Sequence, residues 1–164
     1  MNMSIIKNED SPTYNGALKN TDDDYIEQAK RILKKRFQRS SAINNPQTIK
    51  DYLILHYSTV QREVFSVVSL DAQHRVISIR ELFLGTINSS GVHPREVVKA
   101  ALADNANSVI FAHNHPSGIP EPSQADKSIT EKLKNALDLV EINVLDHIIV
   151  GGGNAFSFAE SGLM

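Results

Sequence analysis

Two histidines, His113 and His115, lie two residues apart at the end of an apolar run in the stretch FAHNHPSGIPEPSQAD. Side chains two apart on a β-strand point to the same face, so both imidazoles can converge on one ion, about 2.0–2.1 Å from each nitrogen. A loop rich in Pro and Gly follows, and Asp126 then stands three residues after Ser123, a natural helix cap. A carboxylate in that first turn points back toward the strand end and completes a His-His-Asp ligand set.

This ligand set would supply the chemistry of a catalytic zinc site. Three protein ligands leave a position open for water, whose pKa zinc lowers toward about 7. Hydrolysis also needs a general base, most often a glutamate in the same cleft, and the hydroxyl of Ser123 could donate to the developing oxyanion. Each feature alone has a simpler interpretation, since Ser123 and Asp126 also fit an ordinary helix start. The conjunction of the features favours a metal site.

The composition narrows the classes of site and of protein. The chain contains no cysteine, so disulfides, thiolate zinc sites and cysteine nucleophiles are excluded. The 41% hydrophobic and 22% charged residues are typical of a globular domain, and the net charge of −2 argues against a uniformly basic nucleic-acid-binding protein. No apolar stretch approaches the roughly 20 residues of a membrane span, and we recognise no signal peptide. We therefore expect no membrane association and a cytoplasmic location.

Hydrophobic periodicity predicts the elements that must position the site. The first helix is expected to be capped by Asp22–Asp24, and the second to open at Thr48 with Asp51 as its capping-box partner. The expected helices are 21–40, 48–60, 93–106 and 123–141. Two or three antiparallel strands are expected within 62–85, and single strands at 108–112, 142–150 and 155–159. This mixed order predicts an α/β fold in which a mixed β-sheet is flanked by helices.

The domain organisation follows from the same pass along the chain. Residues 1–21 are polar without an apolar period, so we expect a disordered tail. Residues 22–44 read as a basic amphipathic helix and linker, and 45–164 as one domain. The basic helix could contact nucleic-acid phosphates, or it could pack on the domain or on a second copy of the chain.

Three stretches of the sequence resemble a known family. H-x-H-P followed by S-x-x-D, with the aspartate eleven residues after the second histidine, resembles the JAMM (MPN-plus, JAB) metalloprotease signature. The sequences of three segments are similar to those of the RadC-like branch of this family, historically named for DNA repair: GTINSSGVHPREVVKAAL, HNHPSGIPEPSQAD and VLDHIIVG. The resemblance covers residues 45–164 and implies a cytidine deaminase-like JAB/MPN sandwich. The sequence motif of the helix-hairpin-helix region that longer RadC proteins carry is not found, so we expect a short RadC-like protein.

The resemblance also implies roles for particular residues. The zinc ligands would be His113, His115 and Asp126. Ser123 matches the family's serine, which helps to stabilise the tetrahedral intermediate. Glu63 matches the catalytic glutamate, although the glycine-containing strand that usually follows it is absent from VFSVVS. The rival general base is Glu96, in the first turn of a predicted helix, where the helix dipole favours a glutamate anyway.

These roles imply a zinc-dependent hydrolase that cleaves a peptide or isopeptide bond, with a protein or peptide as substrate. Conjugates of ubiquitin-like proteins are the substrates of eukaryotic relatives, but the sequence itself names none. The alternative is a DNA-associated repair or recombination accessory protein, whose metal is structural or acts on nucleic acid.

Three neighbouring features have open or structural interpretations. His147 follows Asp146 in the apolar stretch VLDHIIV, and this pair is either a satisfied polar group of the core or a device that orients a metal ligand. Asn114 points to the face opposite its two histidine neighbours and is expected to fix a loop. Gly118 is expected to need a positive φ.

Overall fold

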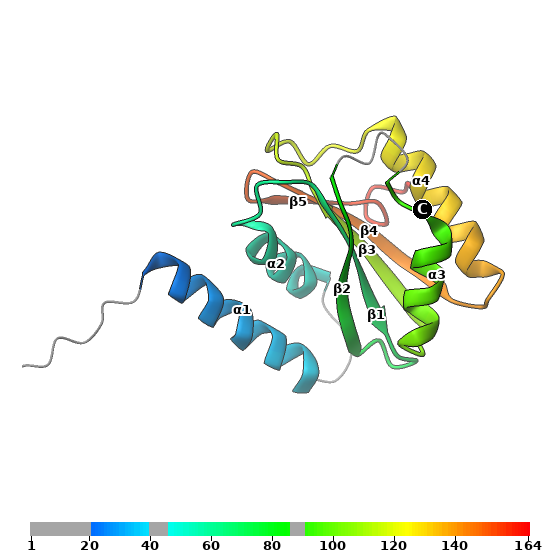
Figure 1. Ribbon diagram of the computed structural model, residues 1–164, viewed down its shortest axis with the longest axis horizontal. Helices are drawn as coiled ribbons and strands as arrows, with labels where there is room; N and C mark the ends of the chain where they lie inside the picture. The colour runs from blue at the N-terminus through cyan, green and yellow to red at the C-terminus, as the bar shows by residue number, and fades with distance from the viewer. Residues whose placement is uncertain (1–20, 40–45, 86–90) are drawn as a thin grey trace, which may run out of the picture.

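The computed structural model describes residues 21–39, 46–85 and 91–164 (Figure 1). Its elements are, in chain order, α1 (Asp22–Arg39), α2 (Pro46–Tyr57), β1 (Val64–Leu70), β2 (Val76–Leu84), α3 (Pro94–Ala103), β3 (Ser108–Asn114), α4 (Gln124–Asp138), β4 (Asn143–Gly151) and β5 (Asn154–Ser157). The expected tail before Thr21 and most of the expected linker lie outside these residues.

A mixed sheet in the order β2-β1-β3-β4-β5 forms the middle layer of the described chain. The β3–β4 pair is parallel, whereas the β1–β2, β1–β3 and β4–β5 pairs are antiparallel. The central strands β1 and β3 are buried along their whole length, which explains why both read as nearly continuous apolar runs. The α/β fold with a mixed sheet flanked by helices is thus confirmed.

Helices cover both faces of this sheet, α2 on one side and α3 with α4 on the other (Figure 1). The core on the α4 side contains Phe65, Val97, Phe111, Leu133 and Leu137, all at most 1% exposed. Full burial of such a side chain stabilises the fold by about 1.5–3 kcal/mol. Leu133 and Leu137 therefore hold α4 against the sheet, and this packing fixes where the first turn of α4 lies.

Two helix starts differ from the expectation. The helix α2 begins at Pro46, so Thr48 is not its cap, and Asp51 instead accepts a hydrogen bond from the Gln47 side chain at 2.7 Å. Proline suits the first helical position because its missing N–H would have no helical partner there. The cap of α1 is Thr21 rather than an aspartate, since Thr21 and Asp24 exchange hydrogen bonds between side chain and backbone.

The register between β3 and β4 changes at one point. Val109 pairs with Val144, but the next residue, Ile110, pairs with Asp146, so Leu145 is an extra residue on β4. Beyond this irregularity Phe111 pairs with His147 and His113 with Ile149.

The helix α1 packs on α2 and touches the edge strand β2. Tyr25 and Ile32 remain exposed on it. The side chains of Lys34, Arg36 and Arg39, on which much of the expected basic surface depends, lie outside the described residues. Among the helices that are described, none has the length and apolar character that a bilayer crossing requires.

Asp104, at the C-terminal end of α3, ties that helix to β1 and β2. Its side chain is 5% exposed and accepts hydrogen bonds from Ser69 at 2.8 Å, from Ser78 and from the guanidinium of Arg80. Burial alone would raise the pKa of Asp104, but the bonds from Arg80, Ser78 and Ser69 together lower it.

We expect Asp104→Asn to lower the free energy of unfolding at pH 7 by about 2 kcal/mol, because hydrogen bonds to a charged group are lost. A depressed pKa gives stability that is present above the unfolded-state pKa, about 4, and is lost as pH falls through the lower folded-state value. The difference between the two proteins should therefore shrink below pH 4 in urea titrations. The exposed Asp138→Asn is the control, and an equal loss in both variants would contradict the assignment.

Candidate metal centre

The two histidines stand at the end of β3 beside the parallel strand β4. His113 is fully buried, and its ring stacks on that of Phe65 across the β1–β3 pairing. His115 lies one residue past the strand, but its backbone N–H still donates to the carbonyl of Val150 at 2.8 Å. Its side chain is 18% exposed. The two rings thus reach the same face of the sheet from adjacent positions, as the spacing predicts.

Asp126 approaches from the first turn of α4 and is 2% exposed. Ser123 caps this helix: its hydroxyl accepts from the Asp126 N–H at 3.1 Å, and the Asp126 carboxylate accepts from the Ser123 N–H at 2.7 Å. The hydroxyl of Ser123 also donates to that carboxylate at 2.6 Å. Ser123 thus holds Asp126 in place, and its proton is directed to Asp126 rather than to open space.

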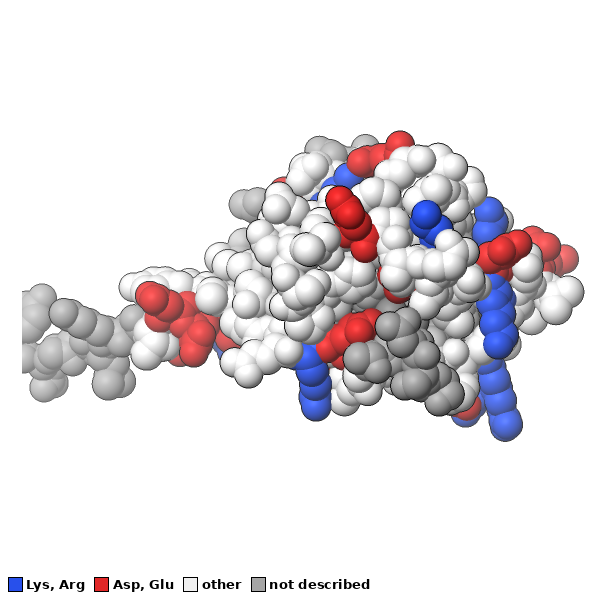
Figure 2. Space-filling view, turned by 90° about the horizontal axis from the view of Figure 1, so that it is seen from above, with Lys and Arg blue, Asp and Glu red and all other residues white. Residues whose placement is uncertain are grey.

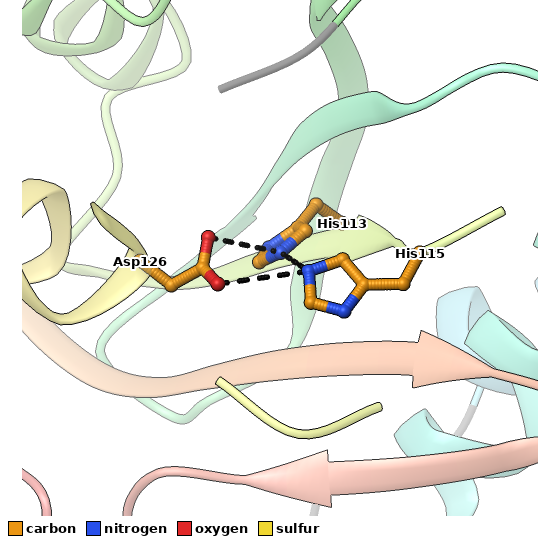
Figure 3. A group of neighbouring side chains, drawn as sticks. All are labelled: His113, His115 and Asp126. Atoms are coloured by element: carbon orange, nitrogen blue, oxygen red, sulfur yellow. Dashed lines mark hydrogen bonds and ion pairs between the residues drawn. The ribbon is translucent and has the colours of Figure 1, made fainter. Parts of the chain in front are cut away.

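The Nε2 atoms of both histidines and the two carboxylate oxygens of Asp126 lie close together (Figure 3). Nε2 of His113 lies 3.0 Å from Nε2 of His115 and 3.3 Å from Oδ1 of Asp126, and Nε2 of His115 lies 3.6 Å from Oδ2. Ligands at about 2.0–2.1 Å around a tetrahedral zinc ion stand about 3.3–3.4 Å apart. These separations are close to those that one such ion requires, and the His113-His115-Asp126 group could hold a metal.

The protonation of His115 also suits a cation. Its Nδ1 lies 2.8 Å from the carbonyl of Ile119, and a carbonyl only accepts, so Nδ1 carries the proton. In the neutral ring Nε2 is then a lone pair that can ligate a cation, whereas in the protonated ring Nε2–H donates to Asp126. The loop that supplies Ile119 lies against the β4–β5 turn, where a Cβ on Gly152 would meet the carbonyl oxygen of Gly118 at 2.6 Å. The positive φ expected at Gly118 is confirmed.

The charges in the site shift the pKa values of its members. Burial would raise the pKa of Asp126, but hydrogen bonds with His113, His115 and Ser123 hold it well below its usual range. The hydrogen bond to Asp126 raises the pKa of His115, and the charge of Glu63 adds to this. The site is thus an anionic pocket in an otherwise apolar layer, which favours a bound cation.

The two candidate bases lie in different places. Glu63 immediately precedes β1 and lies two residues before Phe65, which pairs with His113. Its charge acts on His115, as noted above. Glu96 lies in the first turn of α3 and pairs with Lys99 at 3.0 Å. The charge of Glu63 thus acts on one of the candidate ligands, whereas Glu96 pairs with Lys99 on its own helix.

A further histidine, His147, contacts the ligands in a way the sequence left open. Its Nε2 lies 2.9 Å from Nδ1 of His113, and its Nδ1 lies 2.6 Å from the hydroxyl of Thr130. Asp146 points to the other face, where it accepts from Ser157 at 2.6 Å and from the Ala159 N–H at 2.9 Å. Asp146 is thus the satisfied core group, whereas His147 touches a ligand. Thr130, four residues after Asp126 on α4, is the signal that could have indicated this contact.

Asn114 faces away from the site, as expected. Its side-chain oxygen accepts from the Val64 N–H at 2.8 Å, and its amide donates to the carbonyl of Arg62 at 2.9 Å. This fixes the segment that leads into β1 and so the position of Glu63.

Comparison with known proteins places these features in a family. The model of the RadC-like JAB domain matches residues 43–163. A UPF0758 protein of Pseudoalteromonas translucida is 60% identical over 139 residues, and others from Nitrosococcus oceani and Methylibium petroleiphilum are 53% and 51% identical over the same length. These alignments cover 85% of this chain but only 62–63% of each relative, so the chain spans less than two thirds of their length. The chain belongs to the RadC-like JAB domain family.

Proposed function

We propose that this chain is a zinc-dependent hydrolase that cleaves a peptide or isopeptide bond. One observation carries the proposal: the Nε2 atoms of His113 and His115 lie 3.0 Å apart, and each lies 3.3–3.6 Å from an oxygen of the buried Asp126 carboxylate. With both Nε2 atoms unprotonated, the two nitrogens and the carboxylate would all attract a divalent cation placed among them. Three protein donors also leave a coordination position free, which is typical of catalytic zinc.

His113, His115 and Asp126 would hold the ion, and Glu63 would move protons. When bound, zinc supplies Lewis acidity that polarises a carbonyl and makes water acidic near neutral pH. Glu63 takes the proton from the attacking water and returns it to the leaving amine. The hydroxyl of Ser123 keeps Asp126 in place, and its expected role at the oxyanion stays a prediction because its proton points to Asp126.

The test begins with elemental analysis of the purified protein, which should contain about one zinc per chain. Fluorogenic peptides and isopeptide-linked conjugates are then assayed with zinc-loaded and chelator-treated protein. Hydrolysis should require the metal and return when zinc is restored. Protein that takes up no zinc, or that cleaves none of these substrates when loaded, would count against the proposal.

Replacing Glu63 with glutamine separates chemistry from metal binding. We expect kcat to fall by about 10²–10⁴-fold, the usual contribution of a general base, while zinc content is unchanged. The matched variant Glu96→Gln should keep both properties, since Glu96 faces Lys99 on the surface of α3. Full activity in the Glu63 variant, or its loss in the Glu96 variant, would reverse the assignment.

The nucleic-acid alternative stays a prediction. Figure 2 shows one face on which most atoms are uncharged and basic side chains follow the right edge with acidic side chains beside them. A phosphate-binding surface needs Lys and Arg gathered in one stripe or patch, and the salt dependence of nucleic-acid binding would test for one.

A further inference from the structure

A line of hydrogen bonds links two of the candidate ligand residues, Asp126 and His113, through Thr130 and His147. It begins at the backbone carbonyl of Asp126, which accepts from the hydroxyl of Thr130 at 2.5 Å. Thr130 lies 2.6 Å from Nδ1 of His147, whose Nε2 lies 2.9 Å from Nδ1 of His113. All four residues are buried, with Thr130 the most exposed at 3%. The line therefore joins two candidate ligand residues through two residues that are not themselves ligands.

With both imidazole rings neutral, only one arrangement of protons satisfies every contact in this line. The carbonyl of Asp126 can only accept, so the single hydroxyl proton of Thr130 points to it, as is common for a threonine facing the carbonyl four residues before it. The hydroxyl oxygen must then accept from His147, which sets the ring proton of His147 on Nδ1. The bare Nε2 of His147 accepts from Nδ1–H of His113, and the Nε2 of His113 is left as a lone pair.

The surroundings of His147 keep its ring neutral and still. It is fully buried, and the rings of Phe65, Phe111 and Phe158 surround it at centroid distances of 4.9–5.8 Å. Its ring nitrogens contact Thr130 and His113, not any carboxylate that the structure describes, and burying an imidazolium without a directly bonded anion would be costly. A neutral ring has one proton to place, so the tautomer of His147 sets the tautomer of His113.

We propose that Thr130 and His147 are positioning residues that fix His113 with its proton on Nδ1 and its Nε2 lone pair directed at the metal position. The inference rests on the proposed metal site but names residues outside its ligand set. Since the line ends on the backbone of Asp126, it also couples the orientation of His113 to the first turn of α4. A contact of this kind typically contributes 10–100-fold to metal affinity.

The first test uses the metal-free wild-type chain. Long-range ¹⁵N–¹H correlation spectra report which ring nitrogen of a neutral histidine carries the proton. We expect Nδ1–H for both His113 and His147, with assignments made from single histidine variants. An Nε2–H tautomer at either ring overturns the proposal, whatever the variants below do.

The second test removes the Thr130 hydroxyl, which accepts the hydrogen bond from His147, and keeps the side chain nearly the same size. Thr130→Val should weaken zinc binding by about 10–100-fold in competition with a chromophoric chelator and shift the His147 proton toward Nε2. Thr130→Ser keeps the hydroxyl and should restore both the Kd, within about threefold, and the tautomer. The cobalt(II) absorption spectrum should change in the valine variant alone, because it reports ligand geometry rather than fold stability.

These readouts separate the two proposals. If wild-type protein shows both Nδ1–H rings and the expected zinc affinities but hydrolyses nothing, the positioning role stands and the proposed hydrolase fails. Equal zinc affinity in the valine and wild-type proteins, or equal losses in the valine and serine variants, overturns the positioning role even if hydrolysis is found.

Discussion

Asp126→Ala is expected to abolish zinc binding and hydrolysis together. The carboxylate is the only charged member of the ligand group, and it is almost fully buried between two imidazoles. Without it, two neutral rings remain, and they cannot offset the charge of a divalent ion in an apolar layer. The affinity for zinc should fall by more than about a hundredfold, beyond what a residue that only orients a ligand contributes.

The control for this variant separates the ligand from the helix cap, because Asp126 serves as both. Ser123→Ala removes the capping hydroxyl and should cost about 1 kcal/mol of stability while leaving the carboxylate in place. We expect it to keep about one zinc per chain by elemental analysis. An Asp126→Ala protein that retains zinc at full occupancy would refute the ligand set.

Gly152→Ala is expected to disturb the site from a distance. A Cβ at Gly152 would lie 2.6 Å from the carbonyl oxygen of Gly118, and Gly152 also has a φ of +56°. Both partners are backbone, so the loop after His115 must move away from the β4–β5 turn. Ile119 would then no longer hold Nδ1 of His115 at 2.8 Å. We expect about 3 kcal/mol lower stability and zinc binding weakened by about tenfold or more.

Gly153→Ala is the matched variant. Gly153 also has a positive φ, +79°, but an added Cβ there meets nothing within 4 Å. It therefore carries the backbone strain, about 1 kcal/mol, without the displacement of the loop. Thermal unfolding and chelator competition on both variants measure the difference. Similar zinc affinities in the two variants would show that the contact with Gly118 does not position His115.

Much of the fold can be predicted from local sequence patterns. The apolar runs of β1 and β3, the Pro94 start of α3 and the Ser123–Asp126 capping box each depend on residues within one element. The predicted start of α2 at Thr48 is wrong. Thr48 and Pro46 are both acceptable at the start of a helix, and the choice between them depends on packing.

The candidate site divides in the same way. The spacing of His113, His115 and Asp126 is local, so the sequence could predict that these residues meet. The contact of His147 with His113 joins two strands, and its geometry depends on strand order and register, which no local pattern specifies. The direction of the Ser123 proton likewise depends on where the Asp126 carboxylate settles.

The extra residue on β4 decides which side chain lies beneath His113. Because Leu145 is skipped in the pairing, Phe111 stands beside His147, and His147 shares its face with His113. In an unbroken ladder Phe111 would stand beside Asp146, and the faces of the two residues would be exchanged. A carboxylate would then replace the neutral imidazole against His113, while the imidazole would meet Ser157 and the turn after β5. The group that touches the ligand therefore depends on the register of β4 as well as on its residue types. Removing Leu145 would close the irregularity and keep His147 beside Phe111, whereas forcing Leu145 into the ladder would set an anionic side chain against His113.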